Sequence, residues 1–204
     1  MDESLASLND APAGGLRFDP DLIRKYDGFG PRYTSYPTAD RFHGGFTAAH
    51  YVEALAARRD APTAQPLSLY VHLPFCNTIC YYCACNKIIT ANRGRSAKYT
   101  RYLGHEIGIV SSLIEGDRTV QQLHWGGGTP TFLAHEEMAS LMRMLRDAFA
   151  FASDTEASIE VDPRKVEAST IAFLRELGFN RISFGIQDFD PAVQKAVNRI
   201  QSEE

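Results

Sequence analysis

From Leu67 to the end of the chain, the sequence alternates between strand-like and helix-like hydrophobic periods. Segments 67–72, 122–125, 158–161 and 181–187 are typical of strands, and segments 96–114, 135–149, 166–177 and 190–199 are typical of helices. Such a succession of strand–helix repeats predicts a parallel sheet with right-handed crossovers. The fold class is therefore α/β, either a doubly wound sheet or part of a (β/α) barrel.

The expected strands are apolar on one face and polar on the other. Leu69 and Val71 alternate with Tyr70, Ile159 precedes Glu160, and the last strand ends in Gln187. Parallel strands that are buried on both faces normally have continuous apolar runs. A repeated polar face favours an open or partial barrel with a wet or ligand-filled lumen, in which ligands bind at the carboxyl ends of the strands. The simpler interpretation is that these polar side chains only satisfy one another at the strand ends.

The segment before the repeats has a different composition. Residues 1–17 are rich in Ala, Gly, Asp and Ser without periodicity, which predicts a mobile arm. Residues 26–42 are aromatic-rich and broken by Gly and Pro, and a helix is expected over 48–59. We therefore expect an arm over 1–17, an N-terminal segment with a helix over 18–62, and a barrel domain over 63–204.

Charge and hydropathy exclude several kinds of partner. The chain has 21 basic and 25 acidic residues, a formal net charge of −4, so charge-driven binding to nucleic acid is not expected. No stretch approaches the roughly 18 apolar residues of a membrane helix, and the N-terminus lacks the features of a signal peptide. We expect a cytoplasmic protein without nucleic-acid or membrane partners.

All four cysteines, Cys76, Cys80, Cys83 and Cys85, lie on the loop that follows the first expected strand. A disulfide framework would join distant segments, so this crowding indicates a metal. The C-x3-C-x2-C triad of Cys76, Cys80 and Cys83 can hold one iron–sulfur cluster and leave one iron without a protein ligand. A structural zinc site or a dithiol redox pair are the alternatives.

This triad, placed after the first strand of βα repeats, resembles that of the radical S-adenosylmethionine (SAM) enzymes. The glycine run of HWGGGTPT (124–131) falls where that family has its glycine-rich turn. The resemblance implies a partial radical-SAM barrel made of its first four βα units. It also implies an oxidoreductase in which S-adenosylmethionine chelates the fourth iron of a [4Fe-4S] cluster and is cleaved to a 5′-deoxyadenosyl radical.

The resemblance also assigns roles to individual residues. It makes Cys76, Cys80 and Cys83 the cluster ligands and leaves Cys85 free. It implies contacts to S-adenosylmethionine from Tyr70, Tyr82, Gly127, Gly128, Thr129, Glu160, Gln187 and Arg199. Position 82 is often Phe in the family, and Tyr keeps the ring.

Four stretches narrow the resemblance to the branch of haem biosynthesis that acts on coproporphyrinogen III without oxygen. They are 30–42, 70–87, 122–131, and the set formed by 158–164, 183–190 and 197–199. The implied reaction is oxidative decarboxylation of two propionates to vinyls, which gives protoporphyrinogen IX and needs a low-potential electron donor. Because the substrate carries propionates, Arg32 and Arg41 are candidate substrate contacts.

Two other functions are compatible with parts of the sequence, namely a haem-binding chaperone of the same superfamily and a zinc-bearing structural domain. Cys85 and segment 30–42 argue against the chaperone. Family members are more than twice as long as these 204 residues, so the resemblance implies that the last barrel strands and a C-terminal domain are missing. We therefore expect no turnover by the 204 residues alone.

Overall fold

A computed structural model describes residues 19–28, 38–59 and 65–202. The chain divides into two compact units, Met1–Thr47 and Ala48–Glu204. The described part of the first unit contains helix α1 (Pro20–Tyr26) and the 3-10 turn η2 (Ala39–Arg41). Asp19 caps α1, because its carboxylate accepts hydrogen bonds from the first backbone N–H groups of the helix. The arm expected over 1–17 lies outside the described residues.

The second unit is built on a parallel sheet with the strand order β1-β4-β5-β6. Its strands are β1 (Leu67–Leu73), β4 (Thr119–Gly127), β5 (Ala150–Val161) and β6 (Arg181–Phe184). Its helices are α2 (Ala48–Arg59), α3 (Gly94–Leu113), α4 (His135–Ala148), α5 (Ala168–Glu176) and α6 (Pro191–Ala196). Two short strands, β2 (Phe75–Cys76) and β3 (Ile88–Ile89), pair within the loop after β1. The predicted βα repeats and the α/β class are confirmed, and the four strands of the main sheet are all parallel.

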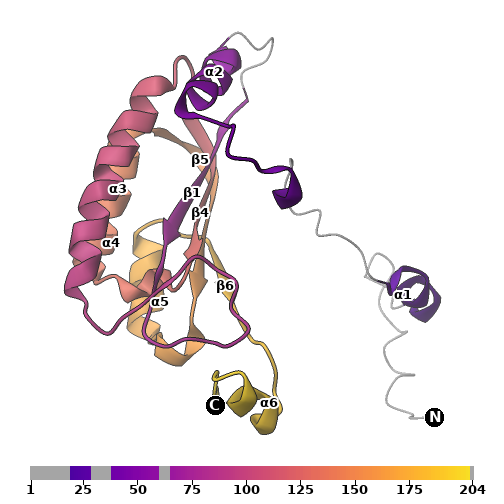
Figure 1. Ribbon diagram of the computed structural model, residues 1–204. Helices are drawn as coiled ribbons and strands as arrows, with labels where there is room; N and C mark the ends of the chain where they lie inside the picture. The colour runs from indigo at the N-terminus through magenta and orange to yellow at the C-terminus, as the bar shows by residue number, and fades with distance from the viewer. Residues whose placement is uncertain (1–18, 29–37, 60–64, 203–204) are drawn as a thin grey trace. The chain divides into compact units, whose positions relative to one another are not determined.

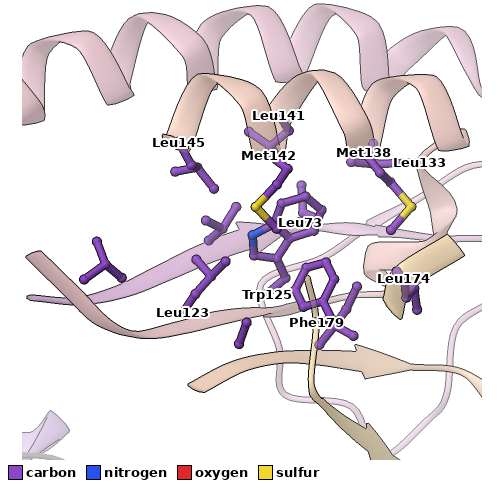
Figure 2. Close-up of a cluster of buried hydrophobic side chains, with 14 of the residues drawn as sticks. Leu73, Leu123, Trp125, Leu133, Met138, Leu141, Met142, Leu145, Leu174 and Phe179 are labelled. Carbon is purple, nitrogen blue, oxygen red and sulfur yellow. The ribbon is translucent and has the colours of Figure 1, made fainter. Parts of the chain in front are cut away.

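The hydrophobic core lies between one face of this sheet and its crossover helices. Helices α3 and α4 run side by side along that face (Figure 1). Trp125 and Leu123 of β4 are buried beneath α4 (Figure 2). The residues that α4 buries recur at helical spacing, and they are Met138, Leu141, Met142 and Leu145. Leu174 of α5 joins the same cluster, so all three crossover helices share one core.

The opposite face of the sheet is polar, as the strand alternation predicts. Along β1, Val71 and Leu73 are buried, whereas Tyr70 is exposed and His72 is half-buried. On β5, Glu160 is likewise half-buried between two buried apolar neighbours. The sheet therefore presents its polar side chains on the face that the core does not use.

Two predicted boundaries are wrong at the C-terminal end. Strand β6 stops at Phe184 instead of continuing to residue 187, because its partner β5 ends at Val161 and Pro163 lacks the N–H that a further ladder bond requires. Helix α6 stops at Ala196 instead of 199, because Asn198 adopts a left-handed φ of 53°. Both breaks lie next to the polar end of the sheet.

Strand β5 is longer than the predicted segment 158–161, since it starts at Ala150, directly after α4. Its register against β4 shifts within the strand, because Val120 pairs with Phe151 but Gln122 pairs with Glu156. An irregular pairing of this kind leaves no strict alternation in the sequence, so the periodicity predicts only the regular half of the strand.

The core generates a stability prediction. Leu141→Ala should lower the free energy of unfolding by about 2–5 kcal/mol, because the side chain of Leu141 is fully buried on the inner face of α4 and its removal leaves a cavity. The measurement is urea denaturation followed by circular dichroism. Ile109→Ala on α3, where the side chain is 63% exposed, is the control and should change stability by no more than about 0.5 kcal/mol. Equal effects of the two variants would contradict the placement of the core.

Candidate functional site

A cavity of about 270 Å³ lies at the carboxyl ends of the strands. In parallel sheets this is the end at which ligands bind, because loops that follow the strands converge there. The cavity is lined by all four cysteines and by most of the residues that the sequence assigned to S-adenosylmethionine. Those residues are Tyr82, Gly127, Gly128, Thr129, Glu160, Gln187 and Arg199.

Hydrogen bonds hold the cysteine loop in shape. Cys76 ends β2, and its carbonyl accepts from the backbone N–H of Thr90 at 2.9 Å. The backbone N–H of Cys83 donates to the carbonyl of Cys80 at 3.0 Å, which closes a turn between these two cysteines. The ammonium of Lys87 donates to the carbonyl oxygens of Cys83 at 2.8 Å and Cys85 at 3.3 Å. The loop therefore presents its thiols from an ordered backbone.

Residues near the C-terminal end of the described chain clamp this loop from the other side. The backbone N–H of Tyr81 donates to the carbonyl of Val197 at 3.0 Å, and the amide of Asn198 donates to the carbonyl of Ile79 at 2.7 Å. The guanidinium of Arg199 lies with Nη1 3.7 Å from the sulfur of Cys80. We call residues 197–199 the loop clamp.

The thiols fit a cluster with one thiolate for each of three irons. Cys76, Cys80 and Cys83 are half-buried, whereas Cys85 is exposed. The hydroxyl of Thr129 lies 3.6 Å from the sulfur of Cys76. Among the described residues, no three His, Cys, Asp or Glu side chains form a site for a single metal ion. A cuboidal cluster does not require such a group, because each of its thiolates binds a separate iron and the thiols need not converge on one ion.

Electrostatics at Cys76 favour the thiol until a cation binds. Burial raises the pKa of Cys76, the hydrogen bond from Thr129 acts in the opposite direction, and the neighbouring Cys83 and Cys80 raise the pKa further. Because metals bind the thiolate, iron must displace a proton here. Loading should therefore release protons and become more favourable as the pH rises.

The glycine turn after β4 crosses the end of β1 at close range. The N–H of Gly128 donates to the carbonyl of Leu73 at 2.9 Å, and the N–H of Thr129 donates to the carbonyl of Phe75 at 2.8 Å. A Cβ on Gly128 would lie 2.7 Å from the carbonyl oxygen of Pro74, so no larger residue fits without a backbone shift. Gly127 has a φ of 115°, which L side chains rarely adopt. The turn therefore requires glycine at both positions.

Glu160 of β5 is held by two residues of the neighbouring strand β4. Its Oε2 accepts from the N–H of Gly127 at 3.1 Å, and its Oε1 lies 3.5 Å from Nε2 of His124. His124 in turn bonds through Nδ1 to the hydroxyl of Ser158 at 2.7 Å. The carboxylate therefore faces the cavity in a defined orientation while it stays 44% exposed and able to bind a ligand.

Some predicted site residues lie elsewhere. Tyr70 is outside the cavity lining, where it stacks on His124 and its hydroxyl bonds to Nδ1 of His72 at 2.9 Å. Arg41 belongs to the first unit, where it is exposed and lies 3.6 Å from Asp40. Arg32 lies outside the described residues.

The cavity also contains charged residues that sequence reasoning did not single out, namely Lys87, Asp162, Arg164 and Lys165. The positions of Asp162 and Arg164 in the sequence could have indicated a role in the site. Both residues flank Pro163 directly after β5, at the end of the sheet where ligands bind. Lys87 gives no comparable signal, because its partners are backbone carbonyls of a loop.

Comparison with known families decides the kind of site. A family model described as the Radical SAM superfamily matches residues 70–204. The chain belongs to the Radical SAM superfamily. Members of this family use a [4Fe-4S] cluster and S-adenosylmethionine, and the thiol triad and the cavity beside it fit that pair of cofactors.

Individual relatives of this radical SAM chain have a more specific name. An oxygen-independent coproporphyrinogen III oxidase of Pseudomonas aeruginosa is 55% identical over 191 residues, which is 93% of this chain and 41% of the relative. The enzyme of the same name from Escherichia coli is 49% identical over 189 residues, 93% of this chain and 40% of the relative.

A solved structure matches the same stretch. Coproporphyrinogen III oxidase (HemN) from Escherichia coli, a radical SAM enzyme, superposes with a TM-score of 0.77 and 47% sequence identity over 92% of this chain and 41% of that one. The radical SAM chain described here thus spans about 40% of the length of the relatives that it matches.

In the described ranges, every helix is too short or too polar to cross a bilayer.

The thiol arrangement predicts which cysteines carry iron. Anaerobic reconstitution should load about four irons per chain, and alanine at Cys76, Cys80 or Cys83 should abolish loading. Cys85→Ala should retain the cluster, because Cys85 is exposed and lies outside the triad. Iron and sulfide analysis with electron paramagnetic resonance is the measurement. Stoichiometric zinc without iron uptake would overturn the assignment.

Proposed function

We propose that this chain carries the cluster- and cofactor-binding part of an oxygen-independent coproporphyrinogen III oxidase. Its reaction is the oxidative decarboxylation of two propionates of coproporphyrinogen III to vinyls, which gives protoporphyrinogen IX. The observation that carries the proposal is the 55% identity over 93% of the chain to the Pseudomonas aeruginosa enzyme of that name. The cavity supports it, because the cysteine triad and the glycine turn line one space.

In this proposal Cys76, Cys80 and Cys83 would hold the cluster, which would leave one of its irons without a protein ligand. When bound, the cluster and S-adenosylmethionine supply the radical that removes a hydrogen atom from the substrate. The chain's own contribution is to hold the thiolates in position and to keep donors beside two of them. Thr129 lies beside Cys76, and Arg199 lies beside Cys80.

Residues on the other side of the cavity would orient S-adenosylmethionine. Glu160 offers a carboxylate fixed by Gly127, which can bind an ammonium group or hydroxyls through charge-assisted hydrogen bonds. Arg199 also lines the cavity, where its guanidinium can bind an anionic group through charge-assisted hydrogen bonds. Tyr82, Gly128, Gln187 and Thr129 complete the predicted contacts. Tyr70, outside the lining, would act only through the neighbouring His72 and His124.

The substrate needs cations for its propionates and an electron source for the cluster. Arg32 and Arg41 remain the candidate substrate contacts, and exposed Lys165 at the cavity adds a further cation. A low-potential donor would reduce the cluster. The crowding of all cysteines on one loop, where no distant segments are joined, supports a cytoplasmic setting.

The direct test is a reaction with the whole protein. Anaerobically reconstituted protein, a low-potential reductant and S-adenosylmethionine should convert coproporphyrinogen III to protoporphyrinogen IX, detected by chromatography and mass spectrometry after oxidation of the products. A protein that cleaves S-adenosylmethionine but forms no vinyl product would refute the proposed substrate. Stoichiometric haem binding without product would instead support the chaperone alternative.

Residues 1–204 alone should form no vinyl product. Within residues 19–28, 38–59 and 65–202, β6 pairs only with β5, so its outer edge is open and the cavity beside it is accessible to water. Radical chemistry needs a closed cavity that excludes side reactions. The same chromatographic assay on the purified 204 residues is the measurement, and product formation would mean that a second copy or another chain completes the barrel.

Glu160 should matter for cofactor affinity. Glu160→Gln keeps the side-chain shape but removes the charge, and it should weaken S-adenosylmethionine binding by about 1.5–3 kcal/mol, the range for a hydrogen bond to a charged group. Isothermal titration with the reconstituted whole protein is the measurement. The matched control is Glu156→Gln on the same strand, whose carboxylate pairs with Arg181 away from the cavity. If Glu160→Gln and Glu156→Gln bind S-adenosylmethionine with the same affinity, Glu160 is only a polar side chain on that face of the sheet and does not contact the cofactor.

A further inference from the structure

A partly buried ion pair lies against the cysteine loop and has no part in the roles assigned so far. Asp162 and Arg164 flank Pro163 after β5, and their side chains are only 10% and 17% exposed. Nε of Arg164 donates to both carboxylate oxygens of Asp162, at 2.9 and 3.2 Å, and Nη2 donates to Oδ2 at 2.6 Å. This is a bidentate contact, so the orientation of both groups is fixed.

Asp162 also faces a second guanidinium. Nη2 of Arg199 lies 3.8 Å from Oδ1 of Asp162 and donates to the carbonyl of Gly185 at 2.7 Å. Nη1 of the same group points to the sulfur of Cys80 at 3.7 Å. One carboxylate therefore lies between two guanidinium groups, and this cluster adjoins a proposed iron ligand.

The charges of this group persist at neutral pH. Burial would raise the pKa of Asp162, but the hydrogen bonds and charge of Arg164, together with the charge of Arg199, hold that pKa below its ordinary value. The hydrogen bond to Asp162 raises the pKa of Arg164, and the nearby Cys80 adds to this rise. With two guanidinium groups and one carboxylate, the cluster has a net positive charge beside Cys80.

The edge of Arg164 that would recognise a ligand is already used. A carboxylate or phosphate binds arginine most favourably across Nε and one Nη, and both of these atoms contact Asp162. Arg164 is therefore poorly placed to anchor a substrate propionate through that edge. Two properties of Arg164 remain to act on the site, namely its fixed charge and its place in the cavity that Cys80 also lines.

We propose that Asp162 and Arg164 tune the reduction potential of the cluster. Asp162 is the positioning residue, because it pairs with Arg199, which contacts Cys80, and with Arg164, which lines the same cavity. The guanidinium charges stabilise the added electron, since net charge and hydrogen bonds to the sulfurs set the potential of such clusters. Partners behind the ligands commonly tune metal centres in this way. The inference rests on the proposed cluster at Cys76, Cys80 and Cys83.

The test is a redox titration of the reconstituted whole protein, monitored by electron paramagnetic resonance in the absence of substrate. Arg164→Gln removes a positive charge and should shift the midpoint potential to a more negative value. Asp162→Asn removes a negative charge but keeps an acceptor oxygen, so it should shift the potential to a more positive value. Arg164→Lys keeps the positive charge but loses the bidentate contact with Asp162. Its midpoint potential should lie between those of the wild type and of Arg164→Gln.

Midpoint potentials that shift in opposite directions in Arg164→Gln and Asp162→Asn distinguish tuning from a merely structural role. A structural role would lower the iron content or shift both potentials in the same direction. Arg181→Gln is the matched control, because it breaks the exposed pair with Glu156 on the same sheet, outside the cavity lining, and should leave the potential unchanged. Equal iron content with unchanged potentials in the Asp162 and Arg164 variants would overturn the inference. Failure of the wild type to load iron would instead overturn the proposed cluster.

Discussion

The site depends on the close crossing of two backbone segments, the end of β1 and the glycine turn after β4. The hydrogen bonds from Gly128 to Leu73 and from Thr129 to Phe75 join the turn to the strand that leads into the cysteine loop. Cys76 follows Phe75 directly, so the same contacts set its distance from Thr129. Because the N–H of Gly127 also binds Glu160, the crossing relates the thiol side of the cavity to its carboxylate side. A side chain on Gly128 would separate the two segments.

The apolar face of the sheet makes this arrangement possible. Helix α4 covers Trp125 and Leu123, and α5 adds Leu174 to the same layer (Figure 2). Since the burial that stabilises the unit is concentrated on one face, the other face can keep side chains such as His124 and Glu160 half-exposed. Polar groups that would be costly in a core are there bonded to one another and available to a ligand.

Much of the fold could be predicted from the sequence because its periodicities are local. The four strand–helix repeats and the polar face that includes Tyr70 and Glu160 all follow from spacing within single segments. The end of β6 could not be predicted in this way, because it depends on where β5 loses its pairing at Pro163. The left-handed Asn198 and its bond to Ile79 depend on a contact between segments 119 residues apart. The thiol triad was visible as a motif, whereas the charge cluster of Asp162, Arg164 and Arg199 required the structure.

The loop clamp also imposes an order of events during biosynthesis. Cys80 leaves the ribosome well before Arg199, which lies 119 residues later in the chain. At roughly 5–20 residues per second, this interval lasts about 6–24 s, during which the cysteine loop has been made but its partners Val197 and Asn198 have not. The thiols of the nascent chain are therefore open to oxidants and to adventitious metals before the native contacts can form. A cell that keeps this loop reduced until synthesis has passed residue 199 protects the thiols until the contacts of the loop clamp can form.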